Sequence, residues 1–350
     1  MRNLFILSML IPLTFSCATA PKPGPMPRQD PLIGKIISAK TKKQVSYDQL
    51  LHTIRAYDVV YISEKHDNPV HHNVQKRIIR DLSESGHPPQ IGFEFFSVSD
   101  TPLLLNFMDS KNARHTPEME NAVQKKMREK LGWTDQTDKM WSFYWSLLTL
   151  ARDNGLTVAG LDLTTSQKRR ITRKGAENLT ALETKQIFST HLNDPVYKAH
   201  MTALFKAVHC GMGHGRMAEK LYDTWLARND RMALSITELH DTKAPNSGPV
   251  IVIMGNGHTE YGLGVMDRVA YLNPSISQLN LAMTEINPTP ADLDDYLTPL
   301  DLKGYSPELP ADFLWFTQRV SYEDPCLKFR KVLEHMKTKK RRNAQNQNGL

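Results

Sequence analysis

The most constraining feature of this 350-residue sequence is a succession of short apolar runs that alternate with helix-like patterns. Runs of four to eight residues rich in β-branched and aromatic side chains predict buried strands. They cover residues 58–63, 91–96, 157–163 and 250–254, with 277–283 and 35–39 as further strands. Amphipathic or apolar helices are predicted between them, at 69–85 and 141–154. Strands and helices in this order predict an α/β fold with a mostly parallel sheet flanked by helices.

Two long segments lack any strand pattern. Residues 101–139 and 167–240 contain amphipathic stretches, and we interpret them as helical insertions that form a smaller all-helical subdomain. The length suits one large domain with such a companion. We therefore expect the folded domain to span residues 34–330.

The N-terminus has the pattern of an export signal. Residues 1–16 combine an early arginine with about a dozen apolar residues, too few to span a bilayer comfortably. Ser16 followed by Cys17 resembles a bacterial lipobox, so Cys17 is predicted to carry a lipid. Ordinary cleavage after Ala20 is the alternative, but it would leave Pro21 as the first mature residue. We favour an exported lipoprotein, anchored in the outer membrane if the cell is Gram-negative.

Proline and charge set both ends of the chain apart from the domain. Residues 17–33 are proline-rich and predict an extended tether. The net charge of +7 comes mainly from the end of the chain, because residues 337–350 hold five cations and no acid. We interpret residues 335–350 as a basic disordered tail. The domain itself is close to neutral, which argues against nucleic acid as a partner.

Polar residues follow several of the predicted strands. In open α/β sheets, ligands bind at the carboxyl ends of the strands. These ends carry Glu64 and His66, then Glu94, Asp162 and His258. A carboxylate inside an apolar strand is costly unless it is paired, so convergence of Glu64, His66, Glu94 and His258 predicts a functional cluster. Each of these residues taken alone could equally be structural.

Two other motifs do not support the functions that they first suggest. The glycines around 255–264 lack the spacing of a dinucleotide fingerprint, so a nicotinamide cofactor is rejected. The segment 209–214 holds two histidines and Cys210, but no second cysteine pair follows, and we expect a helix–helix loop rather than a metal site. An exported protein could pair Cys210 with Cys326, but the sequence does not determine the distance between them.

Five segments together resemble the ChaN-type haem-binding lipoproteins, which belong with the Tiki and erythromycin-esterase-like proteins. The strongest are residues 59–75, which include Glu64-Lys-His66, and Gly255-Asn-Gly-His258. Residues 91–94, 228–233, and 312–317 with 324–326 support them. Ser63 departs from the family, which usually has glycine before the glutamate. The resemblance spans about residues 34–329.

The resemblance implies haem uptake by a lipoprotein that accepts haem near a TonB-dependent outer-membrane receptor. It implies a homodimer that forms on haem binding, with a tyrosine on the iron and a histidine and a lysine on the propionates. Tyrosine ligation suits ferric haem. The tyrosine candidate is Tyr261, with Tyr222 and Tyr197 in reserve. The other candidates are His258 or His214 for the histidine, and Lys174 or Lys168 for the lysine.

The sequence is therefore consistent with two functions of different classes. Haem binding without turnover is the one that we favour. The alternative is a hydrolase, with or without a metal, in which Glu64 or Glu94 acts as base and His66 or His258 as acid or ligand. The sequence has no HExxH or GxSxG motif that would name a substrate.

Overall fold

A computed structural model describes residues 29–112, 116–211, 217–245, 247–324, 326, 327, 330 and 334. The predicted signal 1–16, the lipid-bearing Cys17, His214 and the basic tail 335–350 lie outside the described residues. In the described part of the chain, no helix combines the length and the hydrophobicity needed to cross a bilayer.

The centre of the fold is an eight-stranded sheet with the order β2-β1-β8-β7-β3-β6-β4-β5. The six strands from β8 to β5 run parallel, and β1 is antiparallel to both of its neighbours. This confirms the predicted α/β class. The strands are β1 Ile36–Ser38, β2 Lys43–Val45, β3 Val59–Glu64, β4 Gln90–Ser97, β5 Val158–Asp162, β6 Val250–Gly255, β7 Gln278–Glu285 and β8 Phe313–Thr317.

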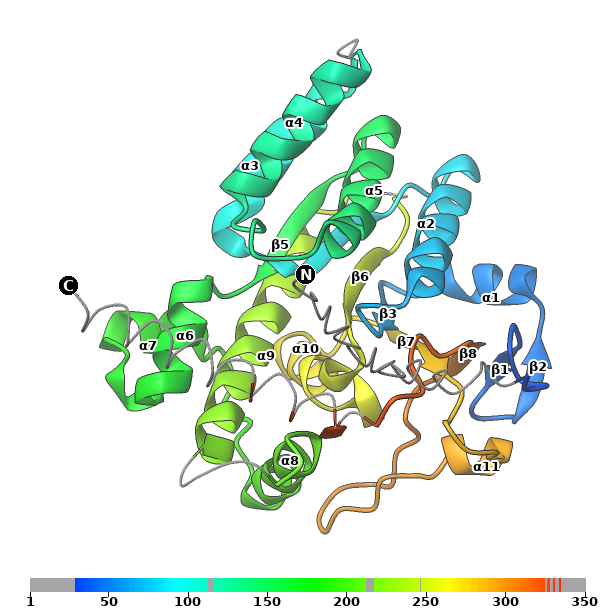
Figure 1. Cartoon of the computed structure of the whole chain (residues 1–350), viewed down its shortest axis with the longest axis vertical. Helices are drawn as coiled ribbons and strands as arrows, with labels where there is room; N and C mark the ends of the chain where they lie inside the picture. The colour runs from blue at the N-terminus through cyan, green and yellow to red at the C-terminus, as the bar shows by residue number, and fades with distance from the viewer. Residues whose placement is uncertain are drawn as a thin grey trace, which may run out of the picture.

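Helices cover both faces of the sheet (Figure 1). The α-helices are α1 Tyr47–Ile54, α2 Pro69–Glu84, α3 Thr101–Met108, α4 Pro117–Lys130, α5 Asp138–Asn154, α6 Thr165–Lys174, α7 Ala181–Ile187, α8 Pro195–Val208, α9 Met217–Asp241, α10 Val265–Leu272 and α11 Leu293–Tyr296. Short 3-10 turns are η1 Val98–Asp100, η2 Asp109–Asn112, η3 Ala176–Asn178, η4 Asn256–His258 and η5 Glu260–Gly262. In the segments without strand patterns, 101–139 and 167–240, the described residues form helices joined by turns and contain no strand.

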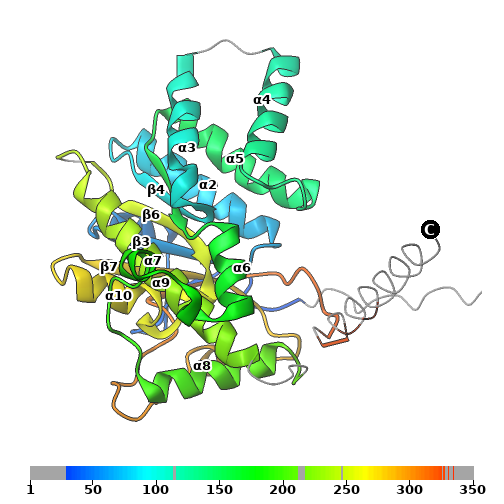
Figure 2. The same cartoon turned by 90° about the vertical axis from the view of Figure 1, so that its left-hand side faces the viewer.

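Successive side chains along each strand point to opposite faces of the sheet, so the core has two layers, one on each face. In β3, Val60 and Ile62 pack with α1, α2, α3 and α5, whereas Val59 and Tyr61 pack with α9 and α10. Strands buried on both faces are expected in a parallel sheet, and they explain why these runs are apolar throughout. Figure 2 shows α3 and α4 standing out from the sheet beside α5.

The helix that follows β3 begins as its sequence predicts. The Asn68 side chain accepts a hydrogen bond from the backbone N–H of Val70, and Pro69 occupies the first helical position. The Asn68 amide also donates to Glu285 and to the Gln318 carbonyl, which ties this helix start to β7 and to the chain after β8. The loop 65–68 is therefore held firmly at the carboxyl edge of the sheet.

Candidate functional site

Glu64 ends β3 as a buried carboxylate, only 2 % exposed. It accepts hydrogen bonds from the Tyr144 hydroxyl at 2.6 Å and the Gln75 amide at 2.5 Å, and its other contact is His66 Nδ1 at 3.1 Å. Burial opposes its ionisation, but the hydrogen bond and charge of His66, the charge of His72 and the hydrogen bond of Tyr144 together hold the pKa of Glu64 below its usual value. Glu64 is therefore a fixed negative charge at the sheet edge.

Glu94, in β4, is the second buried carboxylate. Arg228 Nη2 donates to it at 2.6 Å, the backbone N–H of Gly255 donates at 2.6 Å, and His258 Nε2 lies 3.4 Å away. Burial again favours the neutral acid, yet His258 and Arg228 outweigh it and place the pKa of Glu94 well below its usual range. Both carboxylates are thus stable anions rather than ready proton acceptors.

Arg228, from the middle of α9, joins two strand ends. Its Nε donates to Asp162 at 2.9 Å while its Nη2 binds Glu94. Asp162 also accepts a hydrogen bond from Lys168 Nζ at 2.6 Å. Two cations and two buried carboxylates therefore alternate along the edge of β4 and β5, an arrangement that offsets the cost of burying each charge.

The two predicted histidines differ in their surroundings. His258 is buried, its Nδ1 lies 2.8 Å from Asn229 Oδ1, and its ring stacks on Trp225. The His66 side chain remains 42 % exposed and meets the ring of Phe95 edge-on. Burial lowers the pKa of His66, but the hydrogen bond to Glu64 and the charge of Glu94 raise it above its ordinary value overall. His66 is therefore the more exposed histidine of the cluster.

Two adjoining cavities open at this edge of the sheet, with volumes of about 590 and 540 Å³. His66, Glu94 and Arg228 line both cavities, and we call the combined space the cleft. The first cavity adds apolar and cationic walls from Phe95, Trp133, Met140, Lys130 and Lys168. The second adds Glu64, Lys65, His258 and Arg319. The structure thus brings together the four residues predicted as a cluster: Glu64, His66, Glu94 and His258.

Of the other predicted residues, Lys168 lines the cleft, whereas Tyr261 and Lys174 lie elsewhere. Tyr261 lines a separate cavity of about 210 Å³, which shares Asn256 and Thr284 with the cleft. Burial, and then the Glu260 carboxylate, raise the pKa of Tyr261. Lys174 is exposed in the last turn of α6 and does not line the cleft.

The two reserve tyrosines are part of the protein interior. Tyr197 and Tyr222 pack with Trp225 between α8 and α9. The Tyr222 hydroxyl donates to Asn193 at 2.9 Å. Neither side chain lines the cleft.

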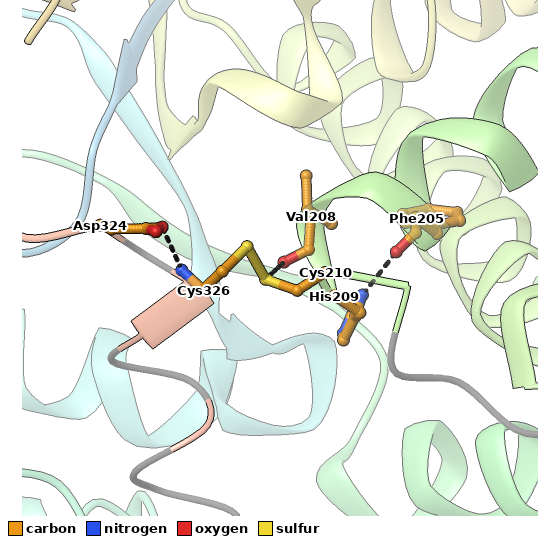
Figure 3. The surroundings of a disulfide bond; sticks show 6 residues. All are labelled: Phe205, Val208, His209, Cys210, Asp324 and Cys326. Carbon is orange, nitrogen blue, oxygen red and sulfur yellow. Dashed lines mark hydrogen bonds between the residues drawn. A yellow bond between two sulfur atoms is a disulfide. The ribbon is translucent and has the colours of Figure 1, made fainter.

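Cys210 and Cys326 form a disulfide, with their Cα atoms 5.5 Å apart across 116 residues of sequence (Figure 3). The bond joins the end of α8 to the chain that follows β8. His209 Nδ1 donates to the Phe205 carbonyl, and the described residues 209–211 form a turn at the end of α8. Among the described residues, no three His, Cys, Asp or Glu side chains gather as metal ligands.

Four important contributors to the site had no role predicted from the sequence, because they lie on helices, which carry no strand-end signal. Tyr144 and Gln75 hold Glu64 from α5 and α2, and Asn229 orients His258 from α9. Arg228 lay in a segment that supported the resemblance but had no assigned role. The sequence did contain one indication of its role. Arg228 lies on the same helix stripe as Trp225 and Met232, which are apolar, so its side chain is expected to face the sheet.

Comparison with known proteins now identifies the family. A family model described as haem-binding uptake, Tiki superfamily, ChaN matches residues 50–269, and this chain belongs to that family. The match contains β3 to β6 and therefore Glu64, His66, Glu94 and His258. No curated protein matches the chain by sequence.

The fold is similar to that of ChaN from Campylobacter jejuni, a structure described as showing cofacial heme binding. The TM-score is 0.58 at 16 % identity, over 80 % of this chain and 95 % of that one. An erythromycin esterase mutant, EreC in its open conformation, gives a TM-score of 0.39 at 12 % identity, over 79 % and 83 %. The type III effector HopBA1 gives 0.37 at 15 %, over 77 % and 92 %.

Proposed function

We propose that this protein binds haem for iron uptake, and that the cleft at the sheet edge receives the haem. The family match over residues 50–269 carries the proposal, and that segment supplies most of the cleft. Haem combines a flat apolar ring with two carboxylates and an iron. A suitable site would need an apolar wall, cations and a side chain that can bind iron.

The first cavity offers the wall and the cations. Phe95 and Trp133 present aromatic surface, while Lys130 and Lys168 lie along the same cavity. Ammonium groups are suited to propionate because they donate charge-assisted hydrogen bonds. The residues therefore fit a haem ring with its propionates, and the bound group would contribute a ferric iron that accepts one protein ligand.

Two residues are candidates for the iron. Tyr261 is the tyrosine that the resemblance implies. It lies outside the cleft, in the cavity that shares Asn256 and Thr284 with it, so a haem bound through Tyr261 would have to reach that shared wall. Because the pKa of Tyr261 is raised, iron would also have to displace the phenolic proton. His66 is the second candidate, because Glu64 engages its Nδ1 and leaves Nε2 for a ligand. A carboxylate behind a histidine is the common arrangement for metal-binding imidazoles.

Several finer features belong to the same proposal. The chain is exported, anchored through a lipid on Cys17 in the outer membrane, and receives haem from a TonB-dependent receptor. Haem bridges two copies of the chain. The disulfide between Cys210 and Cys326 supports export, because such bonds persist in oxidising compartments.

Haem titration followed by the Soret band tests the proposal. We expect a saturable shift for the full chain, and its loss in Tyr261→Phe if this tyrosine ligates the iron. Tyr271→Phe is the matched control, since Tyr271 is 52 % exposed on α10. A shift that survives in Tyr261→Phe but is lost in His66→Ala assigns the ligand to His66. No shift at micromolar haem contradicts the proposal.

One observation favours the hydrolase as a second candidate. His66 is partly exposed in the cleft and carries a raised pKa, so it is suited to donate a proton to a leaving group. Glu64 and Glu94 would act as fixed charges, because their pKa values are lowered. A panel of ester and peptide substrates tests this function. Turnover lost in His66→Ala supports it, and no turnover by the wild-type chain contradicts it.

A further inference from the structure

The helix α6 is a strongly basic element outside the cavities. Its ten residues include five cations and no acid. Ile171 is its one fully buried side chain, and Thr172 bonds Thr224 of α9. The helix is therefore held to the molecule along one stripe, and five of its ten residues, among them Arg169, Arg173 and Lys174, are exposed.

The five cations of α6 fall into two groups. Lys168 pairs with Asp162 in the cleft, and Arg170 pairs with Glu183 of α7. Arg169, Arg173 and Lys174 are exposed, and no ion pair is recorded for them within the part of the chain that the structure describes. Surface cations without carboxylate partners retain their full attraction for an external anion.

The neighbouring helix α7 adds an apolar side chain to this basic flank. Leu182 is 66 % exposed, the largest exposure among the large hydrophobic residues that the structure describes. Lys185 lies three residues further along α7, on the same side of the helix, and is also exposed. Figures 1 and 2 both place α6 and α7 side by side on one flank of the molecule.

We propose that this flank, formed by Arg169, Arg173, Lys174, Leu182 and Lys185, docks on an anionic phospholipid bilayer. Exposed cations on one helix and an exposed apolar side chain on the neighbouring helix are a combination that binds the headgroup region, where the charges meet phosphate and the apolar group reaches the acyl boundary. Glu177, between the two helices, is exposed, so the four cations outnumber it. A second protein would need a shaped apolar partner for Leu182, whereas a bilayer needs none.

Docking through this flank has a consequence for the cleft. Lys168 lines the cleft from the same helix that carries Arg169 and Arg173. A bilayer held against α6 therefore fixes the direction in which the cleft opens. Docking of this flank on a bilayer does not depend on which ligand the cleft binds.

Vesicle co-sedimentation tests the docking. The full chain carrying Cys17→Ser, so that no lipid is attached, is mixed with phosphatidylcholine vesicles with and without phosphatidylglycerol. We expect binding only to the anionic vesicles. The combined variant Arg169→Gln, Arg173→Gln and Lys185→Gln should bind about a hundredfold more weakly, since each cation near such a surface contributes about fivefold.

The matched control removes three exposed cations from elsewhere: Lys40→Gln, Lys125→Gln and Lys126→Gln. Both triple variants have the same net charge and keep the basic tail, so a difference between them reports on the flank. Leu182→Ser in the wild-type background should lower the binding that remains at high salt. Equal binding by the two triple variants overturns the proposal, as does equal binding to neutral vesicles. Thermal unfolding checks that every variant is folded.

Discussion

Arg228 compensates the negative charge of the cleft, because it is the cation that contacts both of the buried carboxylates Glu94 and Asp162. Replacing it in Arg228→Gln leaves Glu94 and Asp162 without their shared partner. We expect the free energy of unfolding at neutral pH to fall by about 2–4 kcal/mol, since removing one partner strands buried charge. Urea unfolding measures this. Arg231→Gln is the control, because its partner Glu238 is exposed, and it should cost less than about 1 kcal/mol.

The pH dependence of the same variant has a definite sign. The pKa of Glu94 lies well below the ordinary value of 4.5 in the folded chain, so the unfolded chain binds more protons as pH falls through that region. The ionised Glu94 stabilises the fold fully above about pH 4.5, and this contribution is lost as the pH falls through the pKa that Glu94 has in the folded chain. The difference in the free energy of unfolding between wild type and Arg228→Gln should therefore become smaller as the pH is lowered. A gap that is constant from neutral to acid pH would contradict this assignment.

At this scale the sequence reveals only part of the site. Glu64, Glu94 and His258 could be predicted because a parallel sheet brings strand ends to one edge whatever the side chains are. Tyr144 contacts Glu64 across 80 residues of sequence, and Arg228 contacts Glu94 across 134. Such contacts depend on how helices pack, and no local pattern encodes that packing.

Among the secondary-structure elements, β4 and β5 depend on a glycine. A Cβ atom on Gly160 would lie 2.1 Å from the carbonyl oxygen of Ser97, where the pairing of the two strands becomes irregular. Gly160→Ala should therefore lower the free energy of unfolding by about 3 kcal/mol or more, because backbone must move. Gly92→Ala is the matched control, since its Cβ would meet the Leu161 side chain at 2.8 Å. We expect it to cost about 1 kcal/mol, and equal losses in denaturant unfolding would refute the argument.

The disulfide fixes the segment that follows β8. Arg319 of this segment lines the cleft, and its Nη1 donates to the Ile286 carbonyl. Replacing both Cys210 and Cys326 with serine should lower stability by about 2–4 kcal/mol, because the unfolded chain regains freedom over the 116 residues between them. Guanidinium unfolding with and without reductant measures the loss. Cys17→Ser is the control and should respond to reductant as wild type does; a double variant as stable as wild type would argue against the role of the bond.

The sequence predicted the buried central strands correctly, but it gave no indication of the short, exposed strand β2. The run 250–254 lies in β6, where every residue is buried, so its apolar composition follows from its place in the sheet. β2 has three residues and an exposed face, which gives it no distinctive pattern. β8 is as apolar as a central strand, and in the sequence its residues 313–317 are marked only by the resemblance. The pairing of Cys210 with Cys326 needed the fold, because the spacing of two cysteines does not determine their distance.

For the molecule as a whole, the strand order explains why one edge collects the chemistry. β3, β6 and β4 are neighbours in the centre of the sheet and deliver Glu64, His258 and Glu94, although these residues are spread over nearly 200 positions. Helices close this edge from outside, with α5 and α9 supplying the groups that hold the charges. The sequence predicted the parallel sheet and the helical companion, whereas only the fold shows that α9 reaches the strand ends.

Haem-linked dimerisation is the prediction that involves the whole molecule. If haem bridges two copies, binding and assembly are linked, and the dimer fraction must rise with haem concentration. Sedimentation velocity of the full chain carrying Cys17→Ser should show monomer without haem and dimer at saturation. Tyr261→Phe should weaken the dimer and the Soret shift together, while Tyr271→Phe should change neither. A monomer that persists when the Soret titration is complete would retain haem binding but exclude the bridged arrangement, and a dimer present without haem would show that protein contacts alone hold the two copies together.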